Sequence, residues 1–169
     1  MIEQMTGAGT GTGLGKATFA AGCFWGVEAA FRKLKGVIST RAGYTGGQLK
    51  NPAYRDVCTD TTGHAEAVEI TYDPALVSYE QLLFEFFRIH DPTTPDRQGP
   101  DFGSQYRSAI FYHDDAQRAA AESFIMQLGK SGRYRQPVVT QVVPAREFYE
   151  AEEYHQQYFE KNKGARCHI

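Results

Sequence analysis

The chain has 169 residues, of which 41% are hydrophobic and 13% aromatic, so it is long enough for one substantial core and short for two domains. Its 18 basic and 20 acidic residues give a net charge of −2, which is no electrostatic reason to expect nucleic acid or an anionic membrane surface as a partner. The apolar runs fall short of the roughly 18 residues of a membrane-spanning helix, and we expect a soluble, monomeric protein of the cytoplasm.

The first fifteen residues differ in composition from the rest of the chain. Residues 1–15 are rich in glycine and threonine and hold a single charge, at Glu3. Such a composition cannot bury enough apolar surface to fold, so it predicts a disordered leader or a cloning remnant. We expect one catalytic domain over 16–169.

Hydrophobic spacing predicts the elements of the first half of the chain. A short apolar strand over 16–21 is followed by apolar residues at helical spacing, from Phe24 to Leu34, until Gly36 ends the pattern. A second strand over 37–44 leads into a loop through Asn51 and Pro52. A third strand covers 64–72.

Capping signals and turn residues mark the second half. Ser78 and Gln81 form a capping box for a helix that runs to Phe87, and the prolines and glycines of 91–103 predict a loop. A strand over 107–112, a helix capped by Asp114, a strand over 138–143 and a helix over 147–161 follow. This order predicts an α+β fold: a two-layer α/β sandwich with a ferredoxin-like βαββαβ core, a C-terminal helix and an irregular tail.

Cys23 is the first candidate for chemistry because it lies at the predicted turn from strand to helix. Unpaired amides and the positive end of the helix dipole favour an anion there, so they favour the thiolate. The neighbours Phe24 and Trp25, set between two glycines, suit a pocket for an apolar group. The alternative for such a cysteine is a small buried hydrophobe.

Glu66 is the second candidate because strand alternation places it on the apolar face. His64, Glu66, Val68, Ile70 and Tyr72 share that face, whereas Glu69 lies on the other. Burial raises the pKa of a carboxyl, which would let Glu66 act as a general acid near neutral pH. The alternative is an inward glutamate satisfied by a salt bridge, for example to Arg41.

The other two cysteines and one histidine have less local support. Cys58 precedes a turn and is interpreted as structural. Cys167 lies in a tail with several cations, where a thiol could swing to a partner sulfur. His155 falls on the aromatic stripe of the helix predicted over 147–161 and is interpreted as a hydrogen-bonded core residue.

Five segments resemble the A-type peptide methionine sulfoxide reductases in order and spacing, from Phe19 onward. They are Gly22-Cys23-Phe24-Trp25-Gly26, Gly43-Tyr44-Thr45-Gly46-Gly47, Gly63-His64-Ala65-Glu66-Ala67, 101–108 with Gln105-Tyr106-Arg107-Ser108, and Tyr154-His155-Gln156. One such segment is compatible with chance, but five in register are not.

The resemblance implies an enzyme that reduces the S epimer of methionine sulfoxide, free or in oxidised proteins. Cys23 is then the nucleophile, Phe24 and Trp25 hold the methyl group, and Glu66 protonates the oxygen. It further implies hydroxyl donors at Tyr54 and Tyr106, a polar pocket residue at Asp101, and a resolving cysteine at Cys167 that forms a disulfide with Cys23, which thioredoxin reduces. No cofactor or metal is implied.

Three other classes of function compete with this one. Cys23 with His64 as its base would suit an acyl-transfer enzyme. Cys23, Cys58, His64 and Cys167 could ligate zinc, although their spacings match no structural zinc site. An aromatic pocket without catalysis would suit a peptide-binding module.

Overall fold

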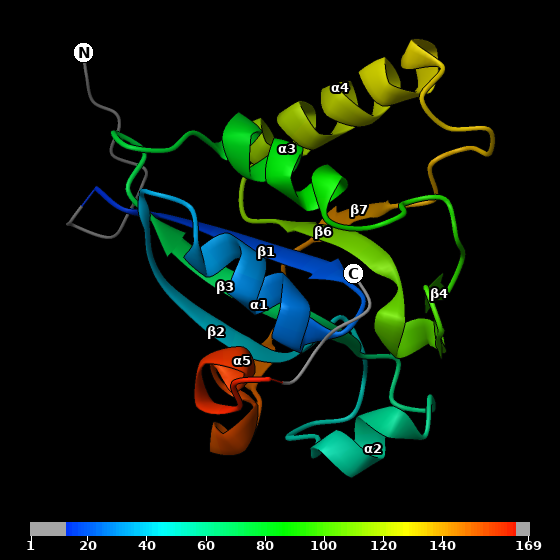
Figure 1. Cartoon of the computed structure of the whole chain (residues 1–169). Helices are drawn as coiled ribbons and strands as arrows, with labels where there is room; N and C mark the ends of the chain where they lie inside the picture. The colour runs from blue at the N-terminus through cyan, green and yellow to red at the C-terminus, as the bar shows by residue number, and fades with distance from the viewer. Residues whose placement is uncertain (1–12, 165–169) are drawn as a thin grey trace.

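The computed structural model describes residues 13–164 (Figure 1). The predicted leader therefore lies largely outside the described residues, as does Cys167. The strands are β1 (Gly15–Ala21), β2 (Val37–Thr45), β3 (Ala65–Tyr72), β4 (Arg97–Gln98), β5 (Asp101–Phe102), β6 (Ser108–Tyr112), β7 (Gln141–Pro144) and β8 (Phe148–Glu150). The α-helices are α1 (Phe24–Arg32), α2 (Tyr54–Cys58), α3 (Tyr79–Arg88), α4 (Asp115–Ser131) and α5 (Tyr158–Lys161), with 3₁₀ turns at Ser104–Tyr106 and Glu153–His155.

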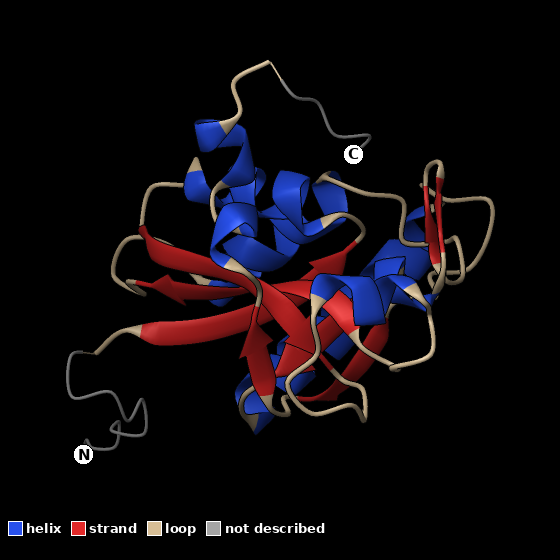
Figure 2. Cartoon of the chain, turned by 90° about the horizontal axis from the view of Figure 1, so that it is seen from below, coloured by secondary structure: helices blue, strands red, loops and turns tan. Residues whose placement is uncertain are grey.

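Six of the strands form one strongly curled, mixed sheet in the order β7-β6-β1-β3-β2-β8 (Figure 2). The pair β6 and β7 is parallel, and the other neighbouring pairs are antiparallel. The predicted α+β class is confirmed. The ferredoxin-like description stays a prediction, because the sheet extends beyond a four-stranded core through β7 at one edge and β8 at the other.

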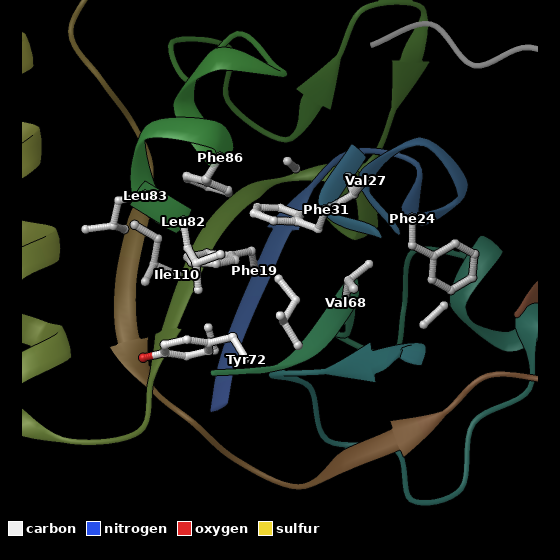
Figure 3. Close-up of a cluster of buried hydrophobic side chains, with 14 of the residues drawn as sticks. Phe19, Phe24, Val27, Phe31, Val68, Tyr72, Leu82, Leu83, Phe86 and Ile110 are labelled. Carbon is white, nitrogen blue, oxygen red and sulfur yellow. The ribbon is translucent and has the colours of Figure 1, made fainter. Parts of the chain in front are cut away.

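The main core lies between the sheet and helices α1 and α3 (Figure 3). Phe19 of β1 stacks on Phe31 of α1 at 5.3 Å and on Phe86 of α3 at 5.0 Å between ring centroids, and all three side chains are fully buried. Burial of one such ring contributes about 1.5–3 kcal/mol. This packing fixes α1, and with it Cys23, against the sheet.

The alternation predicted for the third strand is confirmed. Glu66, Val68 and Ile70 of β3 are buried on the face of the main core, whereas Ala65 and Ala67 pack in a second buried cluster with Phe111. A strand places successive side chains on opposite faces, so this register leads Glu66 toward α1.

Both predicted helix caps are confirmed. The Ser78 hydroxyl accepts a hydrogen bond of 3.1 Å from the amide of Gln81, whose side chain accepts one of 2.8 Å from the amide of Ser78. The Asp114 carboxylate accepts a hydrogen bond of 2.8 Å from the amide of Gln117. Each cap satisfies amides that the first helical turn leaves without partners.

The prediction of one helix over 147–161 is wrong. This segment contains β8, a 3₁₀ turn and the single turn α5, with Gln157 in the left-handed region at a φ of 53°. Tertiary contacts override its helical spacing, because the Gln156 side chain bonds both the amide and the carbonyl of Ala42, at 2.8 and 2.9 Å. The amide of Ala151 also donates to the Ala42 carbonyl.

Two smaller predictions also need correction. The loop after Pro52 contains the helix α2. The amide of its N-cap residue, Ala53, donates to the Asp56 carboxylate at 2.9 Å. The strand predicted over 138–143 begins only at Gln141, because the amide of Val139 donates to the carbonyl of Pro92 instead. Within the described residues, no helix has the length and apolar character needed to cross a membrane.

Candidate active site

Cys23 lies at the turn between β1 and α1, as predicted. Gly22 makes this turn with a φ of 92°, a backbone conformation that side chains with a Cβ rarely adopt. Cys23 is the N-cap residue of α1 and is half-buried. Its thiol therefore lies beside the first amides of a nine-residue helix, where a negative charge is stabilised.

Glu66 reaches the same helix terminus from β3. One oxygen of its carboxyl group accepts a hydrogen bond of 3.2 Å from the amide of Phe24, the residue directly after Cys23, and Glu66 is 1% exposed. The structure thus brings together the two residues on which the predicted chemistry depends. The salt bridge to Arg41 that was considered for Glu66 is not formed, because Arg41 pairs with Glu69 at 2.8 Å and with Glu150 at 3.3 Å.

Two tyrosines surround the Glu66 carboxyl. Burial and the neighbouring Glu66 charge raise the pKa of Tyr54 and of Tyr106 well above the ordinary value for a phenol. Both hydroxyls therefore stay protonated and can donate hydrogen bonds. Tyr106 also lies within electrostatic range of Cys23 and Asp101, so the five polar residues proposed from the sequence that fall within 13–164 gather in one region.

Aromatic rings from both ends of the chain surround Phe24 and Trp25. The half-buried Trp25 ring stacks on Tyr158 with centroids 3.6 Å apart, and its indole nitrogen donates a hydrogen bond of 2.9 Å to Nδ1 of His155. Phe24 is 1% exposed and packs against His155 at 5.1 Å and Tyr44 at 5.6 Å. The prediction of a hydrogen-bonded, buried His155 is confirmed, although it lies in a 3₁₀ turn rather than on a longer helix.

Glu152 is a residue of this region that the sequence did not indicate. Its carboxylate accepts hydrogen bonds of 2.9 Å from the amide of Tyr54 and from the hydroxyl of Tyr44. Burial by itself raises the pKa of Glu152, but these two donors hold it below its ordinary value. Glu152 therefore ties α2, which carries Tyr54, to β2 and to the C-terminal segment. No local pattern marks a single glutamate for such a contact.

His64 is placed so that it cannot serve as the base of an acyl-transfer site. Its Nδ1 accepts from the amide of Gly47 at 3.0 Å, and its Nε2 lies 2.7 Å from the carbonyl of Leu49. A Cβ at position 47 would lie 2.3 Å from the backbone of His64, so the glycine is required for this close approach. Both ring nitrogens are engaged with the backbone, which removes the support for this alternative.

Cys58 is exposed at the end of α2, so its thiol does not pack in the core, and its interpretation as a structural cysteine stays a prediction. Partial burial raises the pKa of the Cys58 thiol. A hydrogen bond with Tyr54 lowers that pKa, but the charges of Glu66 and Glu152 raise it further. A thiol with a raised pKa is a poorer nucleophile near neutral pH, which favours Cys23 in that role. Among the residues that the structure describes, no group of three histidines, cysteines or acidic residues could hold a metal ion.

Comparison with known proteins identifies one family. The model of the peptide methionine sulfoxide reductase family matches residues 15–169. The peptide methionine sulfoxide reductase MsrA of Methanothermobacter thermautotrophicus is 64% identical over 154 residues, which cover 91% of each chain.

Solved structures agree with this match. The reduced form of Mxr1 from Saccharomyces cerevisiae is 36% identical with a TM-score of 0.84, and the match covers 92% of this chain and 90% of that one. A structure of Mxr1 in complex with Trx2 is 29% identical with a TM-score of 0.60, over 87% of this chain and 86% of that one.

Proposed function

The chain belongs to the peptide methionine sulfoxide reductase family and is an enzyme of the A type, and we propose that Cys23 and Glu66 carry its chemistry. The observation behind this proposal is the 3.2 Å hydrogen bond between the Glu66 carboxyl and the amide that follows Cys23. It sets a proton donor and a nucleophile at one helix terminus, where both can meet the same sulfoxide group.

The proposed reaction is displacement at sulfur. The Cys23 thiolate attacks the sulfoxide sulfur and forms an S–S bond while the oxygen takes a proton from Glu66. The hydroxyl then moves from the methionine sulfur to the Cys23 sulfur as the S–S bond breaks, which yields methionine and a sulfenic acid on Cys23. Cys23 is oxidised and the methionine sulfur is reduced, so no other oxidant or reductant enters this step. Glu66 is 1% exposed, and because burial favours the protonated form of a carboxyl group, its position supports the role of proton donor.

The oxygen of the substrate is proposed to accept hydrogen bonds from Tyr54 and Tyr106. The raised pKa of each hydroxyl supports this role, since a phenol that does not ionise remains a donor. Asp101 is proposed as a polar wall of the same pocket, next to Tyr106. These donors would stabilise the charge that develops on the oxygen as its bond to sulfur breaks.

The methyl group of the substrate is proposed to lie against Phe24 and Trp25. Phe24 is nearly covered by protein, so the half-buried Trp25 offers more of the contact surface. The stacking of Trp25 on Tyr158 and its bond to His155 support a fixed position for that surface.

Recovery of the enzyme is proposed to use Cys167. Its thiol would attack the sulfenic sulfur of Cys23, form a disulfide and release the oxygen as water. Thioredoxin would then reduce the disulfide, a role supported by the similarity to Mxr1, which has been solved in complex with Trx2. A reducing compartment such as the cytoplasm suits this cycle.

The family resemblance further implies that the substrate is the S epimer of methionine sulfoxide, free or protein-bound. From the length of the chain and the order of its predicted elements, we propose a monomer of one ferredoxin-like domain over 16–169 that works without a cofactor.

A single-turnover assay tests this function. The reduced enzyme is mixed with each epimer of a blocked methionine sulfoxide, and free thiols are counted before and after. We expect about one equivalent of methionine from the S epimer, with the loss of two thiols as the disulfide forms. Equal turnover of both epimers, or methionine formation without thiol loss, would contradict the proposal.

A further inference from the structure

Two adjoining hollows meet at the end of helix α3, and the smaller one extends over helix α1. The larger has a volume of about 550 Å³ and lies between the end of α3 and the segment that follows α4, which Figure 1 shows running back toward β7. The smaller, of about 340 Å³, lies over Gly26, Ala29 and Ala30 of α1 and over Lys33, which caps the end of this helix. Arg88 and Ile89 line both, so the two form one continuous surface, here called the basic groove.

The basic groove carries an excess of positive charge. Arg88, Arg133 and Arg135 line its larger part and Lys33 its smaller part, while Asp91 is the acidic residue among the described residues that line it. The chain as a whole has a net charge of −2, so this excess is local and is not the consequence of a basic surface.

Among the described residues, three of these cations, Lys33, Arg133 and Arg135, have no acidic partner. Arg88 pairs with Glu85, but within residues 13–164 neither Arg133 nor Arg135 forms an ion pair. Asp91 is already engaged, because its carboxylate accepts hydrogen bonds from the amide and hydroxyl of Thr93. The hydroxyl of Tyr134, in the same wall, is buried and has no hydrogen-bond partner in the described chain. These donors suit a carboxylate, which arginine binds through two parallel hydrogen bonds.

The smaller part of the groove runs along α1, the helix that Cys23 caps. Cys23 and Lys33 flank this nine-residue helix and lie ten positions apart, a rise of about 15 Å. An extended peptide covers about 3.3 Å per residue, so a chain held at Cys23 by its oxidised methionine spans the length of α1, as far as Lys33 in the smaller hollow, in about four to six residues.

The geometry points to the basic groove as a binding site for an acidic stretch of an oxidised protein substrate, about four to six residues from the methionine sulfoxide. This inference rests on the proposed function and adds to it a preference among substrates. The arginines recognise the flanking carboxylates, while the reaction itself stays with the residues around Cys23.

The experiment compares peptides with one methionine sulfoxide and a run of glutamates at that distance, on either side, with the same peptides carrying glutamines or lysines. Single-turnover rates are measured without thioredoxin, so that only substrate binding and chemistry are observed. For the better-placed glutamate peptide we expect kcat/KM about three- to tenfold above the glutamine peptide, and a loss of this advantage at high salt.

The double variant Arg133→Gln/Arg135→Gln should lose the advantage, and Arg135→Glu should reverse it in favour of lysine. Arg118→Gln is the matched control, because Arg118 is an exposed arginine near the other end of α4 that pairs with Glu122. All variants should reduce a blocked methionine sulfoxide at the wild-type rate. Thermal unfolding checks that each variant is folded.

The outcomes separate this inference from the proposed function. If the blocked methionine sulfoxide is not reduced by the wild type, the proposed function fails. If it is reduced but the glutamate and glutamine peptides react equally, or if the double variant keeps the preference, only the groove assignment is overturned. The double variant could instead change only how turnover depends on the thioredoxin concentration. That result would also overturn the groove assignment, because it would show that the groove binds thioredoxin and not the substrate.

Discussion

Trp25 and His155 are joined by a hydrogen bond of 2.9 Å between the indole nitrogen and Nδ1, although 130 residues separate them in the chain. Burial lowers the pKa of His155, despite the opposing charge of Glu152, so the imidazole is neutral near pH 7 and Nδ1 can accept this bond. The contact connects the start of α1 with the C-terminal segment. It sets the ring that the proposed mechanism uses against the methyl group of the substrate.

Replacement of His155 by phenylalanine should therefore weaken substrate binding. The variant keeps an aromatic ring but leaves the indole N–H without its acceptor, a loss of about 1–3 kcal/mol. We expect a rise in KM of about tenfold with a smaller change in kcat. Steady-state kinetics measure both, and Tyr154→Phe, at an exposed neighbouring ring, is the control. An unchanged KM in His155→Phe would remove His155 from the positioning of Trp25.

The three cysteines should respond differently to replacement by serine. Cys23→Ser should abolish reduction, because no thiolate remains at the start of α1. Cys167→Ser should reduce about one equivalent of sulfoxide and then stall with thioredoxin as sole reductant. Cys58→Ser is the control and should turn over as the wild type does, since the pKa of its thiol is raised. Continued turnover by Cys167→Ser would refute its resolving role.

Loss of the Glu66 proton should slow the formation of the sulfenic acid. Glu66→Gln keeps the shape and the acceptor for the amide of Phe24 but removes the acid, so we expect a decrease of about 10²- to 10⁴-fold. Glu69→Gln is the matched control on the same strand, because Glu69 faces away from the site and pairs with Arg41. Rapid mixing that follows methionine formation measures the step. A single-turnover rate equal to that of the wild type would exclude Glu66 from the mechanism.

His90 should make the fold sensitive to acid. Burial lowers the pKa of His90 to about 4, and its nitrogens contact the carbonyl of Phe86 and the hydroxyl of Ser108. In the unfolded chain His90 binds a proton near pH 6.5. The contribution of the neutral, buried His90 to the free energy of unfolding is therefore complete above about pH 6.5 and is lost as the pH falls toward 4.

From about pH 7.5 to about pH 5, His90 should account for a decrease of about 2 kcal/mol in the free energy of unfolding. Urea denaturation at both pH values measures it. His90→Gln, which keeps a polar side chain but does not titrate, should show a smaller pH dependence than the wild type by that amount. Parallel curves for the two proteins would show that His90 does not cause the effect.

Several features followed from the sequence by itself because their causes are local. Strand alternation placed Glu66 on the buried face, and capping residues placed the starts of α3 and α4. The change from an apolar strand to helical spacing placed Cys23 at a helix start. Each depends on residues within a few positions of one another. The five segments shared with the family then indicated the chemistry, because short sequence motifs surround the residues that are expected to react.

Only the tertiary structure decided the course of 147–161 and its role at the site. The helical spacing of this segment was outweighed by hydrogen bonds from Gln156 to Ala42 and by the bond between His155 and Trp25. The basic groove arises in the same way, since Lys33, Arg88 and Arg135 come from distant parts of the chain. The hydrophobic spacing of a segment predicts which of its faces is apolar, but it does not predict which distant segment of the chain will pack against that face. The energy of a tertiary contact depends on both segments, and the sequence pattern describes only one of them.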